Sequence, residues 1–356
     1  MIISSKILNA LFILLLPVAF VSCGANDYAG GGIGGTGISV GKITAFGTGT
    51  VDVNGIVFET SNASVTLDGK TGGQNNLKTG MVVKVRGKFN QDGKTGVAAS
   101  IEFRDNLEGP VDDFSRSSNT IAVLGQTVKL GSTTYFDDFS DTNGDNIIDV
   151  YDVSFGNIVE VSGFIDANGI INATYISLKA VSFESDGFEI EVKGTITDLN
   201  MDNQTFAIGY LTIDFSSADF VKDITSDSLT DGLYIEIKST SGPYSNILVA
   251  SSIELEEHRH DADEGERIEV EGFVTDVTGL DSENRFEIEG QPVQIMTNTL
   301  FKNDGIKADI GLNVKIEVKG SMDAYGVLVA DEIEIESADE VSDNESGHSD
   351  DEESGE

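Results

Sequence analysis

The chain has 356 residues, of which 22 are Lys or Arg and 61 are Asp or Glu, so its formal net charge is −39. Such a charge repels polyphosphates, which argues against nucleic acid as a partner. Forty glycines, 4 prolines and the absence of any sustained helical apolar period are typical of short strands joined by glycine turns. We therefore expect an all-β chain that is long enough for three or four domains.

The N-terminus has the pattern of an export signal. Lys6 gives it a positive charge, residues 7–20 are largely apolar, and Cys23, the one cysteine of the chain, follows an apolar and a small residue. This arrangement resembles the lipobox of bacterial lipoproteins, which implies that residues 1–22 are removed and that Cys23 is acylated. The alternative is an ordinary secretory signal followed by an incidental cysteine. Gly24, in place of the Asp that favours inner-membrane retention, favours the outer membrane.

Residues 23–38 contain a run of glycines, and we expect them to form a tether too flexible to pack. A phosphate-binding loop of the dinucleotide type needs a strand before it and a helix after it. Neither is predicted here, so we do not assign that role.

The rest of the chain repeats one pattern four times. Apolar residues alternate with charged ones, a glycine and a turn follow, and a second alternating strand returns, as in a half-buried β-hairpin. In the third copy Ser239 replaces the glycine. The hairpins lie at 83–102, 159–176, 235–253 and 314–337. With the strands that precede each hairpin, they define four β-modules at 39–105, 106–180, 188–256 and 266–337.

A glycine-rich segment after a lipobox, Gly32 to Ile38, followed by repeats that end in V-x-V-x-G and A-x-x-I, resembles a family of bacterial envelope lipoproteins. Their repeated domain has no known function, and the resemblance implies an OB-like barrel for each repeat and no established activity. The strand pattern agrees, since each module has five predicted strands. In module 4 they are Ile268–Val277, Arg285–Glu289, Val293–Met296, Lys315–Lys319 and Val327–Ile335. In module 1 the corresponding strands before the hairpin are Thr50–Asn54, Val57–Thr60 and Ser64–Leu67. We predict a tandem array of about four small OB-like five-stranded barrels, with a β-sandwich as the alternative.

Two acidic segments lie outside the modules. Residues 257–265 form a linker that contains His258 and His260, a pair that is either a transition-metal site or, as we favour, part of a solvated charged connection. Residues 338–356 have almost no apolar side chains, and we expect them to be disordered. Neither segment offers the apolar surroundings that shift a catalytic pKa, so we expect no enzyme activity.

Module 2 contains a longer connection before its hairpin than the other modules. Its residues 141–152, D-T-N-G-D-N-I-I-D-V-Y-D, resemble the calcium loop of EF-hands, and more closely that of dockerins, which ends in Asp. The resemblance implies one Ca²⁺ held by Asp141, Asn143, Asp145, the carbonyl of Ile147, Asp149 and Asp152. Asn146 stands where glycine is usual, and asparagine tolerates the left-handed conformation required there. By the same resemblance, Ile148 is expected to turn inward as the apolar anchor of the loop. Only one loop is present and a strand follows it, so cohesin binding is not implied.

Together these features predict an exported, membrane-anchored lipoprotein of the cell envelope. They favour the outer membrane, with the chain facing the periplasm or the cell surface. We expect a non-catalytic binding or structural role, an unidentified envelope protein or glycan as partner, and no nucleic acid. The alternative is a saccharide-binding protein that uses the barrel faces. The absence of tryptophan and the presence of 8 tyrosines argue against strong sugar stacking without excluding it.

Overall fold

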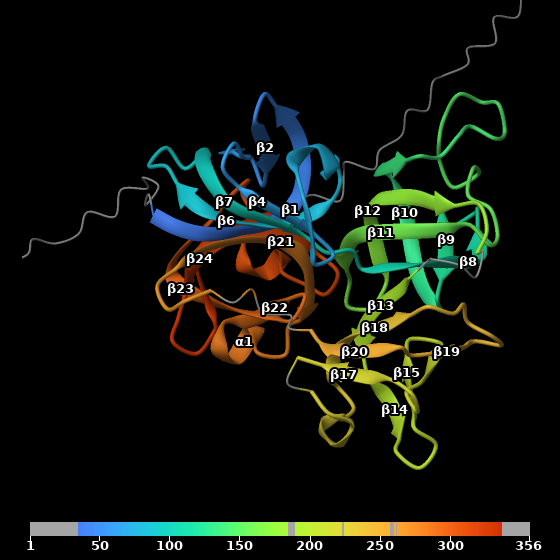
Figure 1. The fold of residues 1–356 in the computed structure, drawn as a ribbon. Coiled ribbons are helices and arrows are strands. Elements are labelled where there is room, and N and C mark those ends of the chain that lie inside the picture. The colour runs from blue at the N-terminus through green and yellow to red at the C-terminus, as the bar shows by residue number, and fades with distance from the viewer. Residues whose placement is uncertain (1–34, 184–188, 223, 257–259, 261, 337–356) are drawn as a thin grey trace, which may run out of the picture. The chain divides into compact units, whose positions relative to one another are not determined.

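The structure, a computed structural model, describes residues 35–183, 189–222, 224–256, 260 and 262–336. These residues form four small β-barrels in succession (Figure 1), and their one α-helix is the four-residue α1 (Leu280–Glu283). The predicted all-β fold with four repeats is therefore confirmed. The signal segment, Cys23, His258 and the tail, on which several predictions depend, lie outside the described residues.

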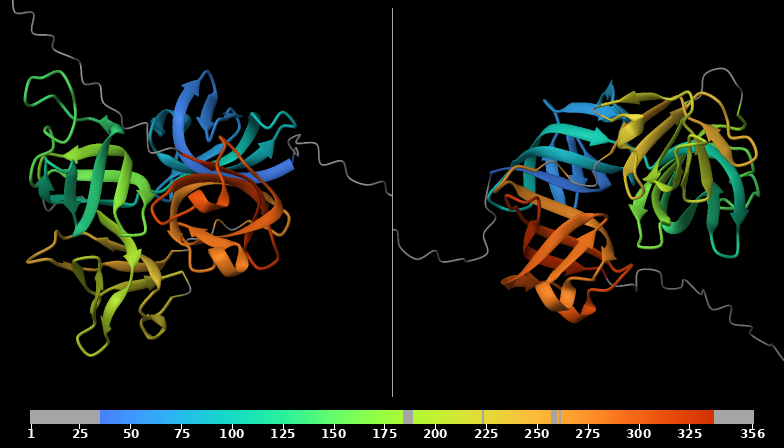
Figure 2. Two further views of the ribbon diagram at one scale, coloured as in Figure 1. Left: turned by 180° about the vertical axis from the view of Figure 1, so that it is seen from behind. Right: turned by 90° about the horizontal axis from the view of Figure 1, so that it is seen from below.

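Module 4 shows the barrel in its simplest form. Its first strand pairs with the second, the second with the third, the third in parallel with the fifth, the fifth with the fourth, and the fourth again with the first. This closed order is that of the OB fold, and Figure 2 shows these orange and red strands curving round to meet. The five strands are β21 (Arg267–Asp276), β22 (Arg285–Ile288), β23 (Gln291–Phe301), β24 (Lys315–Met322) and β25 (Leu328–Ile335).

Module 1 has the same closed order, with its third strand divided in two. The strands are β1 (Gly35–Gly47), β2 (Thr50–Val53), β3 (Ile56–Glu59), β4 (Ser64–Leu67), β5 (Lys70–Gly72), β6 (Val82–Phe89) and β7 (Thr95–Phe103). β3 and β4 pair in succession with β7, so Ser64–Leu67 continues the third strand instead of forming a separate one. The first strand of this barrel is β1, which begins within the segment that we expected to be a tether.

Modules 2 and 3 repeat the order. Module 2 consists of β8 (Leu107–Ser115), β9 (Thr120–Val123), β10 (Gln126–Asp137), β11 (Ile158–Ile165) and β12 (Ile171–Ala180). In module 3 the first, third and fifth strands are each interrupted. Its strands are β13 (Ile190–Thr195), β14 (Thr197–Asn200), β15 (Thr205–Ile208), β16 (Leu211–Asp214), β17 (Asp219–Val221), β18 (Tyr234–Ser239), β19 (Ile247–Val249) and β20 (Ser252–Leu255).

Apolar and polar residues alternate along the strands, and the apolar side chains fill the barrel interiors. In β24, for example, Ile316, Val318, Gly320 and Met322 are buried, whereas the residues that alternate with them are partly exposed. The buried apolar residues fall into three clusters. One contains the interior of module 1 together with Tyr175 of module 2, one contains module 4 together with Ile38 of β1, and the third is continuous through modules 2 and 3.

Strand pairing also joins the barrels. Residues 37–40 of β1 pair with β6 on one edge and in parallel with residues 267–270 of β21 on the other. Likewise Leu107 and Glu108 of β8 pair with Val192 and Glu191 of β13. The expected tether is therefore wrong for residues 35–38, because they form a strand and Ile38 is fully buried. A side chain at Gly37 would lie 2.6 Å from the carbonyl oxygen of Arg267, so only glycine fits between these strands.

Candidate functional site

The predicted calcium loop lies in the connection between the third and fourth strands of module 2, drawn in green in Figure 1. β10 ends at Asp137 and β11 begins at Ile158. The other three modules have a short 3-10 helix in this connection, namely η1 (Gln74–Asn76), η2 (Ser226–Ser228) and η3 (Lys307–Asp309). The insertion thus replaces a short helix and leaves the barrel closed.

Side chains at alternate positions of the loop bind its own main chain. The two carboxylate oxygens of Asp141 accept the N–H groups of Gly144 at 2.6 Å and Asn146 at 2.8 Å. Asn143 Oδ1 accepts the N–H of Asp145 at 2.9 Å, and Asp145 Oδ1 accepts that of Ile147 at 2.8 Å. Each bond turns an oxygen-bearing side chain back onto the chain, which winds the segment into one tight loop.

Asn146 has a φ of 66°, the left-handed conformation that a sixth loop position requires. Val150 and Val153, with exposed fractions of 3% and 0%, fasten the end of the loop to the barrel. We expected Ile148 to turn inward as the apolar anchor, and this is wrong because 39% of it is exposed. The two valines make the contact that anchors the loop instead.

Asp152 joins the two ends of the loop. Its Oδ1 accepts the N–H of Thr142 at 2.6 Å and the hydroxyl of Thr142 at 2.9 Å, and its Oδ2 accepts the N–H of Asp149 at 3.1 Å. Burial opposes ionisation of this carboxyl, but the hydrogen bonds outweigh it and lower the pKa of Asp152. The last predicted ligand is therefore held as a carboxylate beside the start of the loop.

The predicted ligands are only partly gathered. Asn143 Nδ2 donates to Asp145 Oδ2 at 2.9 Å, and Asp149 Oδ1 accepts the N–H of Tyr151 at 2.8 Å. Where the structure describes the chain, three acidic ligand atoms within 4.8 Å of one another occur at Asp68, Asp105 and Glu160 and at Glu236, Glu254 and Glu256, and not in this loop. Binding an ion would thus require the loop carboxylates to move closer together.

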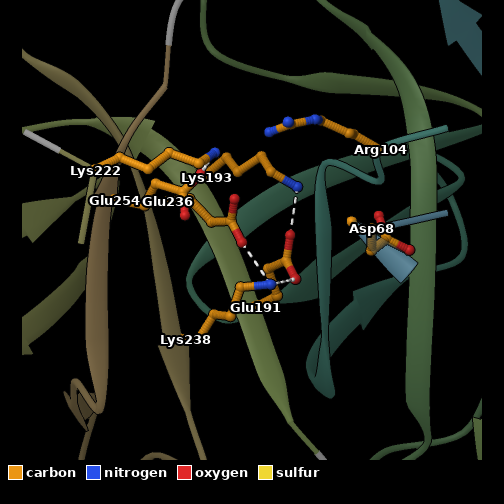
Figure 3. Close-up of a pocket in the computed structure, with 9 residues that line it drawn as sticks. Asp68, Arg104, Glu191, Lys193, Lys222, Glu236, Lys238 and Glu254 are labelled. Carbon is orange, nitrogen blue, oxygen red and sulfur yellow. Dashed lines mark hydrogen bonds and ion pairs between the residues drawn. The ribbon is translucent and has the colours of Figure 1, made fainter. Parts of the chain in front are cut away.

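A second group of charged residues surrounds a cavity of about 170 Å³ between modules 1 and 3 (Figure 3). Its lining contains four cations and four carboxylates, which are Arg104, Lys193, Lys222, Lys238, Asp68, Glu191, Glu236 and Glu254. Lys193 Nζ lies 3.0 Å from Asp105 and 2.5 Å from Glu191. Lys238 lies 2.8 Å from Glu191 and 2.7 Å from Glu236. Each cation of the lining, including Arg104 and Lys222, has a carboxylate partner.

Ion pairing and burial together determine the pKa values of the carboxyl groups in and beside this cavity. Although burial disfavours the charged form of Glu191, Lys193 and Lys238 hold its pKa at about 2. Burial raises the pKa of Asp105 well above its ordinary value, which Lys193 only partly offsets. Burial also raises the pKa of Glu108 to about 7. A ligand entering the cavity would have to displace an ion pair, so we interpret this group as a structural contact between modules.

Sequence reasoning missed this network because its members occupy the charged positions of the alternating strands. Glu191 lies opposite Lys238 and Lys193 opposite Glu236 across β13 and β18. Such positions usually face water, but Glu191 and Glu236 are only 6% and 5% exposed. The available signal was the cross-strand pairing of opposite charges, which requires the register to be known.

The fold defines an all-β protein built from four copies of one five-stranded barrel. The family model of Domain of unknown function (DUF5666) matches residues 40–102, 108–177, 193–254 and 271–334, one match in each barrel. The chain therefore belongs to this family. Comparison with curated proteins gave no match. Within the described residues, no helix has the length and apolar character needed to cross a membrane.

Proposed function

We propose that the protein is an exported, lipid-anchored component of the bacterial cell envelope, with a non-catalytic binding or structural role and one calcium ion in module 2. The hydrogen-bond pattern of residues 141–152 carries the calcium part of the proposal. Asp141, Asn143 and Asp145 turn back onto the chain at successive alternate positions, and Asp152 closes the loop. The lipobox-like sequence before Cys23 supports the anchor.

The ligand set suits a hard cation. Asp141, Asn143 and Asp145 would supply side-chain oxygens, Ile147 its carbonyl, Asp149 an oxygen directly or through water, and Asp152 the closing carboxylate. Four carboxylates in one short loop repel one another, so a divalent cation would relieve this repulsion as well as gain bonds. Magnesium would substitute poorly because it requires six close, rigidly placed oxygens and retains its waters.

We expect the ion to order the loop without deciding whether the barrel folds. Loops of extracellular modules bind calcium with dissociation constants of roughly 10⁻⁴ to 10⁻³ M. At about 1 mM calcium and a dissociation constant of about 0.1 mM, binding stabilises the folded chain by about 1.4 kcal/mol. Val150 and Val153 already hold the loop against the barrel, which supports a fold that exists without the ion.

Calorimetric titration of a chain that begins at Gly24 tests the site. We expect one calcium ion to bind at millimolar or lower concentration. The variant Asp141→Asn, Asp145→Asn should bind at least tenfold more weakly, because it loses two charges, while the amide oxygen at each position can still accept one main-chain N–H. As a control, Asp202→Ala, Asp227→Ala removes two exposed charges from module 3 and should bind normally. No calcium uptake by the unmodified chain, or equal uptake by the loop variant, would contradict the proposal.

The anchor has a separate test. If Cys23 is acylated, the mature protein should partition into the detergent phase, because a chain with net charge −39 has no other attraction to an anionic membrane. Cys23→Ala should release the protein or leave it unprocessed. Unchanged membrane association of that variant would show that the cysteine is incidental.

A further inference from the structure

One face of module 3 differs from the acidic character of the chain. It is formed by β15, β16 and β19 and by the loop that precedes β19. Residues 203–213 and 239–253, which supply most of it, contain no charged residue, although charged residues make up 23% of the chain. On these three strands the one charged residue is Asp214, which ends β16 and pairs with Val249 of β19. The equivalent face of module 4, on β22 and β25, carries Arg285, Glu287 and Asp331.

Two tyrosines project from this face. Tyr210 is 82% exposed and Tyr244 is 83% exposed. Their segments are bound together, because the side-chain amide of Asn246 donates to the carbonyl of Tyr210 and the N–H of Thr212 donates to the carbonyl of Asn246 at 3.0 Å. The two segments that carry these tyrosines therefore form one local surface.

The surroundings of the tyrosines combine apolar and hydroxyl groups. Ile247 and Val249 alternate with buried Leu248 on β19, and each is 43% exposed. Residues 239–246 read S-T-S-G-P-Y-S-N, so hydroxyl and amide groups adjoin the tyrosine. Exposed aromatic rings beside side chains that donate and accept hydrogen bonds suit a ligand with both C–H faces and hydroxyl groups. A saccharide has this chemistry.

Charge narrows the choice of ligand. A cationic peptide would find many carboxylates elsewhere on the chain but only Asp214 on β15, β16 and β19, and an anionic polymer would be repelled by a net charge of −39. A membrane surface is usually met by basic as well as apolar side chains, and residues 203–213 and 239–253 include no Lys or Arg. Of these classes of partner, an uncharged one fits this face best.

We propose that this face of module 3 binds a neutral polysaccharide chain, with the rings of Tyr210 and Tyr244 against sugar faces and the neighbouring hydroxyl and amide groups bonded to sugar hydroxyls. The proposal is independent of the calcium site and of the lipid anchor. Two tyrosines without tryptophan give modest stacking, so we expect weak binding to each short segment of the chain and stronger retention by a long polymer, in which sites recur.

Affinity electrophoresis of the chain that begins at Gly24 tests the proposal. Native gels would contain hydroxyethylcellulose, arabinoxylan, galactomannan, laminarin or dextran as neutral probes, and alginate as an anionic one. We expect at least one neutral polymer to retard the protein and alginate not to do so. Tyr210→Ala, Tyr244→Ala should lower the affinity at least tenfold, whereas Tyr244→Phe should bind nearly as well because it keeps the ring.

Tyr325→Ala is the matched control, because Tyr325 is 84% exposed on module 4 but follows Asp323 in a charged setting. It should bind normally, as should Asp141→Asn, Asp145→Asn, which separates this proposal from the calcium site. Retardation by none of the neutral polymers, or equal retardation of the double tyrosine variant, would overturn the proposal. Sedimentation velocity tests the alternative that a second copy of the chain binds to this face. If the unmodified chain self-associates, the double tyrosine variant is monomeric and no polymer retards the protein, this face is a protein interface and the saccharide proposal is wrong.

Discussion

At the scale of single residues, the glycine of the repeated V-x-V-x-G pattern has a packing cause. A Cβ atom on Gly87, Gly163 or Gly320 would lie 2.0–2.3 Å from a carbonyl oxygen of the neighbouring fifth strand. The register between the two strands shifts at each of these glycines. In module 3 Ser239 occupies the position, its hydroxyl donates to the carbonyl of Val249 at 2.7 Å, and the fifth strand is divided into β19 and β20.

This packing predicts that Gly163→Ala destabilises the protein. The added methyl group would meet the carbonyl oxygen of Asn172 at 2.3 Å, and main chain cannot move aside as a flexible side chain can. Overpacking of this kind typically costs about 1–3 kcal/mol. The measurement is the urea midpoint of unfolding followed by circular dichroism.

Gly131→Ala is the control in the same barrel. A Cβ there would meet nothing closer than 4.0 Å, so the substitution should leave the urea midpoint unchanged or raise it slightly. Equal midpoints for the two variants would mean that the repeated glycine is not required by packing.

At the scale of elements, alternation of apolar and charged residues was enough to predict the strands of module 4 and the number of repeats. It could not predict which strands join different barrels, because pairing between main chains leaves no periodic trace in the sequence. β1 illustrates this, since glycine-rich residues 35–38 resemble a linker, yet Gly37 fits between β6 and β21 because it has no side chain. The loop at 141–152 was visible because its residue types recur at fixed spacing, whereas the inward direction of Ile148 was an analogy that this loop does not follow.

At the scale of the whole chain, the charged positions of the strands explain what holds the barrels in contact. Glu160, Glu191, Glu236, Glu269 and Glu271 are each at most 6% exposed. Their partners are lysines of the same or the adjacent barrel, as for Glu271 with Lys42 of module 1 and Lys315 of module 4. Burying an ion pair is costly unless both charges remain bonded, so these contacts select one arrangement of strands more than they add stability. A further carboxyl at such a contact, whose pKa is raised by burial, should make the packing sensitive to pH.

Glu289, in the turn between β22 and β23, is such a carboxyl at the contact between modules 2 and 4. Its Oε1 accepts the N–H of Ile165 at 3.0 Å. Burial is the main cause that raises its pKa to about 8, Glu271 adds to the rise, and the N–H groups of Ile165 and Phe273 and the charge of Lys315 oppose it. In the folded chain this carboxyl is therefore largely neutral at pH 7.

The sign of the pH dependence follows from proton uptake. An unfolded glutamate loses its proton near the ordinary pKa of 4.5, whereas folded Glu289 keeps it up to a pKa of about 8. Between these values unfolding releases a proton, so stability is greatest below pH 4.5 for this group and declines as the pH rises to about 8. Glu317, with a pKa raised to about 8 by burial and by Glu269, contributes in the same direction.

We therefore predict that Glu289→Gln flattens the fall in melting temperature between pH 6 and pH 9 by roughly 2–4 °C, since the amide cannot ionise but still accepts from Ile165. At pH 9 the variant should melt above the unmodified protein. Scanning calorimetry at both pH values measures the difference, and Glu283→Gln, an exposed glutamate of α1, serves as the control that should keep the original slope. If Glu289→Gln leaves the slope unchanged, the carboxyl is already ionised at neutral pH and the contact between modules 2 and 4 contains a charge paired with Lys315 instead of a neutral acid.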